Sequence, residues 1–225
     1  MPSLAELFCA RSWWLTLFVA PQFLVPAGTA HGEENHEFWP ELQFHYWFDE
    51  NRSRAIFMAS HNRDRDSGSV YQAEEGLTFE HRFTDVIWGR LGYRHGNSTD
   101  GGPFNENRLL AEQIFRVPLP AGVSVDFRTR EDFRWLDTGF SVRLRERMQV
   151  QRDFTIDGYK FTPYASAEVY FDTRYDQVAR YRLIVGVTLP VYRHFSIEPY
   201  LARQVDNAGS FTITNAIGLT LITAF

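Results

Sequence analysis

The chain has 225 residues, of which 44% are hydrophobic and 16% aromatic. This apolar content excludes a disordered or low-complexity chain and is enough for one domain of ordinary size. The net charge of -5 leaves no basic excess to neutralise phosphates, so no nucleic-acid partner is expected. A single cysteine, Cys9, excludes internal disulfides, and no metal-ligand spacing or glycine-rich phosphate loop occurs. We therefore expect no metal and no cofactor.

The first thirty residues have the pattern of a secretory signal peptide. Arg11 precedes a short apolar run over residues 13–25, and the small residues Gly28 and Ala30 follow it. The run is shorter than the ~20 apolar residues that a membrane-spanning helix needs. The expected organisation is a cleaved signal peptide over residues 1–30, a short polar segment over 31–36 and one domain over 37–225.

After the leader, apolar residues recur with a period of two, which is typical of β-strands. From Tyr181 to Leu189 every second residue is large and apolar, and strands of about ten residues can cross a bilayer at a tilt. Eleven segments show this pattern or a weaker form of it: 38–48, 54–62, 71–83, 86–94, 107–117, 123–135, 140–154, 161–171, 178–189, 195–204 and 211–225.

The connections between these segments favour a membrane barrel over a soluble sandwich. Short turns and longer polar loops are the two kinds of connection found at opposite mouths of an outer-membrane barrel. The short ones fall at residues 84–85, 119–122 and 192–194, and the longer ones at 95–106, 172–177 and 205–210. Closed bacterial barrels use even strand numbers, so we expect an all-β, transmembrane antiparallel up-and-down β-barrel of 10 or 12 strands, with segment 38–48 deciding the count.

The last segment carries the most specific signal. Its apolar residues alternate from Ile213 to the terminal Phe225. This arrangement resembles the C-terminal signature by which the barrel-assembly machinery recognises outer-membrane barrels. Phe225 is therefore the expected assembly signal, and the bacterial outer membrane, with its lipid as the surrounding partner, is the expected location.

Several strands carry charge on the face opposite the apolar one. An arginine facing hydrocarbon costs several kcal/mol near the membrane midplane, so these side chains are expected to line the lumen. The predicted ladder, a candidate solute path, is Arg128, Arg130, Arg134, Arg143, Arg145, Arg147, Glu168, Arg180, Arg182 and Glu198. Glu131 and Glu146 have the lipid-facing parity, which predicts either β-bulges or positions near a rim.

Two functions follow from an arginine-rich lumen. Charge pairs between strands could fill a narrow barrel and leave no continuous water path, which would make the barrel structural. An excess of arginine over acid could instead attract anionic small solutes and give a narrow anion-preferring channel.

The segments from Val125 to Glu131, from Arg143 to Arg147, from Tyr164 to Glu168 and from Asp176 to Gly186 together resemble the bacterial barrel family called domain of unknown function 2490, DUF2490. The likeness extends from about residue 39 to residue 225 and implies a Gram-negative outer-membrane barrel of unknown activity.

A second likeness rests on Pro163-Tyr164 to Glu168, on Arg180-Tyr181-Arg182 and on the terminal Phe. These residues are similar to those of the oligogalacturonate and sialic-acid porins. This likeness implies a porin-like basic lumen for acidic oligosaccharides.

The alternative is an outer-membrane lipid-modifying enzyme of deacylase or phospholipase type, or a rim protease. His61, Asp64 and Asp66 cluster at a strand end and are the candidate protease rim. Ser60 and His61 are adjacent on a strand and point to opposite faces, so they cannot form a catalytic pair. A deacylase would need a Ser and a His brought together across strands, and no catalytic residue is assigned from the sequence.

Overall fold

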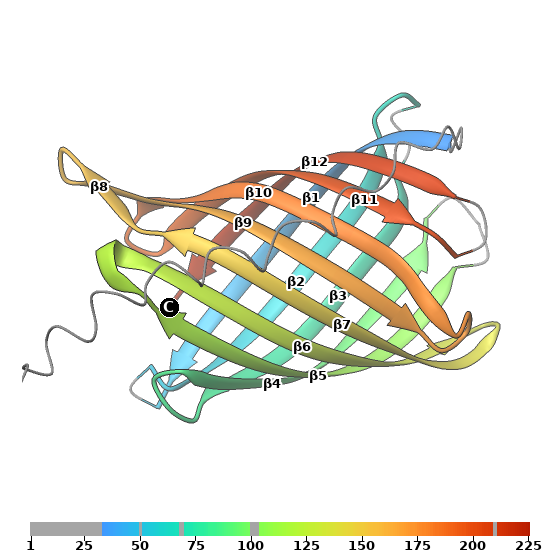
Figure 1. Cartoon of the computed structure of the whole chain (residues 1–225), viewed down its shortest axis with the longest axis horizontal. Coiled ribbons are helices and arrows are strands. Elements are labelled where there is room, and N and C mark those ends of the chain that lie inside the picture. The colour runs from blue at the N-terminus through green and yellow to red at the C-terminus, as the bar shows by residue number, and fades with distance from the viewer. Residues whose placement is uncertain (1–32, 50, 68–69, 100–103, 209–210) are drawn as a thin grey trace, which may run out of the picture. The chain divides into compact units, whose positions relative to one another are not determined.

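The computed structural model describes residues 33–49, 51–67, 70–99, 104–208 and 211–225, which form a β-barrel whose strands run obliquely around its axis (Figure 1). The predicted signal peptide lies outside these residues. No helix in the described ranges is long and apolar enough to cross a bilayer. The one short helical element in those ranges is the 3₁₀ turn η1 (Pro120–Gly122).

Twelve strands follow one another along the chain, and every predicted segment coincides with one of them. Strand β1 already begins within the segment expected to precede the barrel. The strands are β1 (Glu33–Phe48), β2 (Ser53–Asp64), β3 (Val70–Arg82), β4 (Ile87–Ser98), β5 (Asn105–Pro118), β6 (Val123–Leu136), β7 (Gly139–Arg152), β8 (Phe154–Ile156), β9 (Tyr159–Asp172), β10 (Gln177–Tyr192), β11 (Phe195–Asp206) and β12 (Thr212–Ala224).

The barrel closes between its first and last strands. Strand β8 only extends the hairpin to β9, and β7 pairs directly with β9, so eleven strands form the wall and the twelfth is an addition. The expected β-barrel is confirmed and the count of 10 or 12 strands is approximately matched, but the wall has an odd number of strands. All neighbouring strands are antiparallel except β1 and β12, which pair in parallel. An odd number of alternating strands leaves the first and the last pointing in the same direction, which explains the parallel pair.

The connections separate into two mouths. The predicted short turns lie at one end of the barrel, here called the turn mouth, where β3 joins β4, β5 joins β6, and β10 joins β11. The predicted longer loops lie at the other end, the loop mouth, where β4 joins β5, β9 joins β10, and β11 joins β12. At the turn mouth, Asp157 and Gly158 both have positive φ, as a tight hairpin between β8 and β9 requires.

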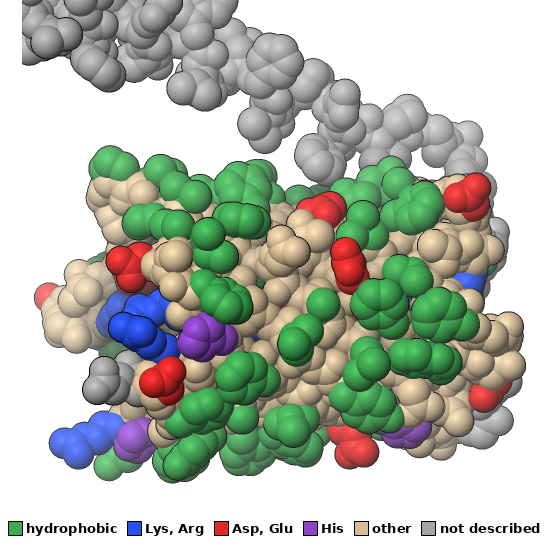
Figure 2. All heavy atoms as spheres, turned by 90° about the horizontal axis from the view of Figure 1, so that it is seen from below, with side chains coloured by type: hydrophobic (Ala, Val, Ile, Leu, Met, Phe, Trp, Pro, Cys, Tyr) green, Lys and Arg blue, Asp and Glu red, His purple; other side chains and the backbone are tan. Residues whose placement is uncertain are grey.

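The distribution of side chains is the inverse of that in a water-soluble barrel. Large apolar side chains stand on the outside, where Leu91, Leu201 and Val185 are more than 60% exposed. Hydrophobic side chains cover much of the outer face in Figure 2, with isolated charges between them. Arginines and carboxylates are buried on the inside. The period of two in the sequence therefore separates an apolar exterior from a charged interior.

Glu131 and Glu146 are part of the exterior. Strands β6 and β7 pair in continuous register through both residues, so the predicted bulges are wrong. Both side chains are exposed and lie within the paired stretch rather than at a rim, and Glu146 accepts a 2.9 Å hydrogen bond from the Thr129 hydroxyl. A regular pleat fixes the parity of each residue, which is why these carboxylates cannot turn inward.

Glycines make room for tyrosine rings on the inner wall. Gly218 is the register partner of Tyr200, and a Cβ added at Gly218 would lie 1.9 Å from Cζ of that ring. On the other side of Tyr200, Gly186 is opposite both Tyr200 and Tyr164, and its Cβ would come within 2.7 Å of each side chain. The missing side chains of these glycines thus leave the space that the two tyrosines occupy on the inner wall.

This packing predicts that Gly218→Ala destabilises the barrel by about 1–3 kcal/mol, the usual cost of overpacking. The measurement is urea unfolding of the protein folded in lipid vesicles. The same substitution made in a Tyr200→Ala background should cost much less, because no ring then occupies the space. Equal costs in the two backgrounds would contradict the proposed packing.

Candidate functional site

The ladder residues predicted from the sequence lie on the inner face of β6, β7, β9, β10 and β11. Their parity is opposite to that of the exposed apolar residues on the same strands. Arg128, Arg130, Arg134, Arg145 and Glu168 are buried, and Arg143, Arg147, Arg180, Arg182 and Glu198 are half-buried.

Four of the eight ladder arginines belong to one connected set of ion pairs, here called the central network. It joins six arginines and four carboxylates from β2, β3, β4, β5, β6, β7 and β9. Its members are Arg54, Arg90, Arg128, Arg130, Arg143, Arg145, Glu80, Glu112, Asp132 and Glu168.

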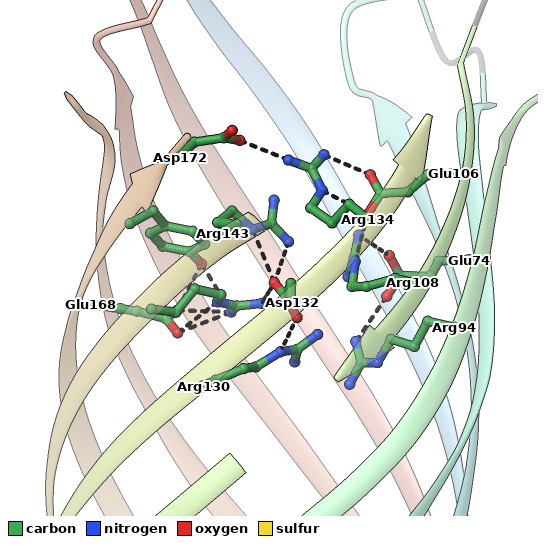
Figure 3. Close-up of polar contacts among 12 residues, drawn as sticks. Glu74, Arg94, Glu106, Arg108, Arg130, Asp132, Arg134, Arg143, Glu168 and Asp172 are labelled. Carbon is green, nitrogen blue, oxygen red and sulfur yellow. Dashed lines mark hydrogen bonds and ion pairs between the residues drawn. The ribbon is translucent and has the colours of Figure 1, made fainter. Parts of the chain in front are cut away.

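Asp132 is the most shared carboxylate of the central network. It accepts a hydrogen bond from Arg130 at 2.5 Å, and Arg143 approaches its other oxygen at 2.7 Å (Figure 3). Arg145 lies 3.8 Å away and also binds both oxygens of Glu168 at 3.0 Å. Because Asp132 has no solvent exposure, these guanidinium groups provide its only described charge compensation.

A second network lies beside the first. Arg134 bridges Glu106 and Asp172, each at 2.7 Å, and Glu106 also accepts a 2.5 Å bond from Arg108. The network continues from Arg108 through Glu74 to Arg94, and from Asp172 to Arg174 in the adjoining loop. The hydrogen bond to Asp172 raises the pKa of the Arg174 guanidinium.

The charged residues of β3, β4 and β5 were not among the predicted ladder residues. Glu74 and Glu80 share the inward parity of β3, Arg90 and Arg94 that of β4, and three charged residues of β5, Glu106, Arg108 and Glu112, follow the same rule. The period-two pattern of charge was the signal that could have found them. Because these strands add four carboxylates and three arginines, they lower the arginine excess inferred from the later strands by one.

Arg182 and Arg147 differ from the other ladder arginines. In the described part of the chain no carboxylate forms an ion pair with either of them. Nε and Nη2 of Arg182 both donate to the side-chain oxygen of Gln204, at 3.0 and 2.5 Å. Arg147 has a buried Nε without a hydrogen-bond partner. Glu198 on β11 accepts bonds from the hydroxyls of Tyr164 and Thr188 rather than from an arginine.

Two adjoining cavities of about 270 and 400 Å³ occupy the lumen toward the loop mouth. They share Trp39, Arg143, Tyr170, Arg180 and Arg182 among their lining residues, and the larger one reaches the loop residues of that mouth. We call the two together the vestibule. Because its wall is predominantly polar and charged, it suits a hydrophilic ligand better than an apolar one.

The other predicted residues have clear structural positions. Phe225 continues the β1 pairing, since its N–H donates to the carbonyl of His45 and its carbonyl accepts from Trp47, and its ring stacks on His194. Asp64 accepts backbone N–H bonds from Asp66 and Ser67, which holds the turn after β2. This contact gives Asp64 a structural role.

One Ser–His pair does form across strands. Ser53 at the start of β2 is opposite His81 on β3, and Ser53 Oγ lies 2.8 Å from Nδ1 of His81. Both residues have outward parity. The groove of about 320 Å³ beside His81 has a mainly apolar surface, although Thr129 and Glu131 are among its lining residues. No group of three potential metal-ligating residues occurs within the described ranges.

The geometry around Asp132 predicts a large effect of one substitution. Asp132→Asn removes the carboxylate shared by three guanidinium groups and leaves buried positive charge uncompensated, so we expect a loss of about 3–5 kcal/mol. The measurement is urea unfolding in vesicles. The neighbouring Glu131→Gln, on the exposed outer face, is the matched control and should cost at most about 0.5 kcal/mol.

Comparison with known proteins supplies a family and no activity. No curated protein matches the chain. The model of the family described as protein of unknown function (DUF2490) matches residues 36–214, which is most of the barrel. The chain therefore belongs to the DUF2490 family.

Proposed function

We propose that this chain is a structural β-barrel of the bacterial outer membrane whose lumen is closed by the central network. The observation that carries the proposal is the burial of the pair at the centre of that network, with Arg130 2% and Asp132 0% exposed. In a water-filled pore, charged groups on the wall would be hydrated and accessible.

The outer surface supports a membrane location. Large apolar side chains on nearly every strand of the wall are exposed, among them Phe44, Phe57, Leu77, Leu109, Phe127, Leu183 and Ile217. Soluble monomers rarely expose apolar patches larger than a few hundred Å². A bilayer removes this surface from water, and a closed barrel leaves no unpaired strand edge in the hydrocarbon.

The composition of the inner wall supports closure. Arg128 on β6 reaches Glu168 on β9 across the intervening strand, and Arg108 on β5 reaches Glu74 on β3 in the same way. Each such pair passes over the inner face of the strand between its two members and so occupies space inside the barrel. Leu110 and Ile114 point inward and are buried beside them. Together the paired charges and apolar side chains fill the space that a solute path would need.

The first test is the conductance of the refolded mature protein in planar bilayers. We expect no conductance steps from a barrel shown to be folded by its heat-dependent gel mobility. Anion-selective steps that become smaller in Arg145→Ala would instead establish the narrow anion-preferring channel and contradict a closed lumen. Reversal potentials measured in a salt gradient give the selectivity.

A second candidate function, hydrolysis of acyl esters in membrane lipids, is favoured by the Ser53–His81 hydrogen bond. His81 Nδ1 would accept the hydroxyl proton as Ser53 Oγ attacks an ester carbonyl, the alcohol would leave with that proton, and water would then release the acyl group. The groove beside His81 lies on the outer face of the barrel, where it would meet lipid and could hold an acyl chain. Ser53 is only 3% exposed, which places this function second, because a substrate must reach its oxygen.

The enzyme function predicts that the protein in phospholipid vesicles releases fatty acid, measured by mass spectrometry. Ser53→Ala and His81→Ala should each lower the rate about a thousandfold or more, since each removes half of the catalytic pair. Ser60→Ala, on the inner face of the same strand, is the matched control and should leave the rate unchanged. If the wild-type protein releases no fatty acid from the vesicles, this function is excluded.

A further inference from the structure

We propose that the vestibule is a binding site for a small oxyanion, held by Arg143, Arg180 and Arg182 around Tyr170. The ligand class is a carboxylate or phosphate group on a small polar molecule. This inference goes beyond the structural role proposed above. It is compatible with a closed lumen, because a ligand would enter the vestibule from the loop mouth and would not need to pass through the barrel.

Four guanidinium groups surround the ring of one buried tyrosine. Tyr170 is 1% exposed, and the guanidinium carbon of Arg145 lies 4.5 Å from its ring centroid. Those of Arg182, Arg143 and Arg180 lie 5.4, 5.6 and 5.6 Å away. These distances favour cation–π attraction, and one ring thereby gathers positive charge from β7 and β10 at the wall of the vestibule.

The carboxylates near this cluster do not balance it. Asp132 forms an ion pair with Arg143, but it also pairs with Arg130 and Arg145. Glu168 forms an ion pair with Arg145, but it also pairs with Arg128. Of these four arginines, Arg180 alone pairs with a carboxylate that no other described arginine shares, that of Asp206. Glu37 and Glu41 also line the vestibule, but neither forms an ion pair with these four arginines in the described part of the chain. The four guanidinium groups therefore outnumber the three carboxylates paired with them, which favours a bound counter-ion.

Arg182 is the arginine best placed to bind that counter-ion. Two of its nitrogens donate to the neutral Gln204 side chain, and no described carboxylate pairs with it. Its guanidinium lies over Trp39, 5.0 Å from the ring centroid, as well as over Tyr170. The two rings fix its position without neutralising it. A fixed guanidinium with an unused Nη1 suits an incoming oxyanion, because little side-chain entropy is lost on binding.

The size and lining of the vestibule define the ligand class. Cavities of about 270 and 400 Å³ hold a small molecule rather than a polymer. Neutral hydrogen-bonding side chains, including Asn62, Gln72 and Thr214, line the cavities together with the arginines. The arginines would therefore bind the oxyanion group of such a ligand, and the neutral side chains would form hydrogen bonds with its other polar groups.

The test uses isothermal titration calorimetry on the folded protein in uncharged detergent micelles at low salt, with citrate and inorganic phosphate as probes. We expect saturable binding of at least one probe, weakening as sodium chloride is added. Arg182→Gln should weaken binding about tenfold or more, because a charge-assisted contact is lost. Arg180→Gln gives a second, independent loss at the same cavity.

Arg203→Gln is the matched control. Arg203 lies on β11, outside the barrel, where it donates to Asn215, so its loss should not change binding. Binding of citrate alone assigns a carboxylate site and binding of phosphate alone a phosphate site, and either supports the inference. Absence of binding by both probes, or unchanged binding in both folded arginine variants, would overturn it. A barrel that binds anions and also conducts would overturn only the closed lumen.

Discussion

The pairing of buried guanidinium and carboxylate groups is the interaction on which the rest of this structure depends. A barrel wall with an apolar exterior must place its polar residues inside, and a lumen this narrow cannot hydrate them all. Most of these charges pair with an opposite charge on the same strand or a nearby one. Asp132 shows the constraint most clearly, since three arginines converge on a carboxylate without solvent contact. Removing one member of such a set costs far more than an exposed ion pair contributes.

The same constraint divides the lumen into a region where the charges are balanced and a region where they are not. Where carboxylates from β3 and β5 meet arginines from β4 and β6, charge is balanced and the space is filled. Toward the loop mouth, β9 and β10 contribute Tyr170 and Arg182, and no carboxylate among the described residues forms an ion pair with Arg182. The filled region gives the barrel its proposed closure. The unbalanced region gives it the proposed affinity for anions.

The exterior presents a separate question, since it carries polar groups among apolar ones. Glu146 and Thr129 bond to each other on the outer face, and the Ser53–His81 pair lies on the same face beside an apolar groove. Hydrogen bonding between neighbouring strands lowers the cost of placing these polar groups on a mainly apolar face. The Ser–His pair thus has a structural reason to exist as well as the chemistry of a potential nucleophile and base.

The sequence by itself determined the strands, the faces and the family resemblance, because a period of two fixes which side chains share a face. That is why the alternation alone is enough to assign Arg128, Arg145 and Arg182 to the inside of the barrel. Only the tertiary structure decided the partners, since ion pairs such as Arg134–Asp172 join residues on non-neighbouring strands, and barrel closure sets which strands face each other. The parallel β1–β12 closure, the pairing of Ser53 with His81 and the contact of Arg182 with a neutral Gln204 all follow from register around the full circumference, which local pattern does not encode.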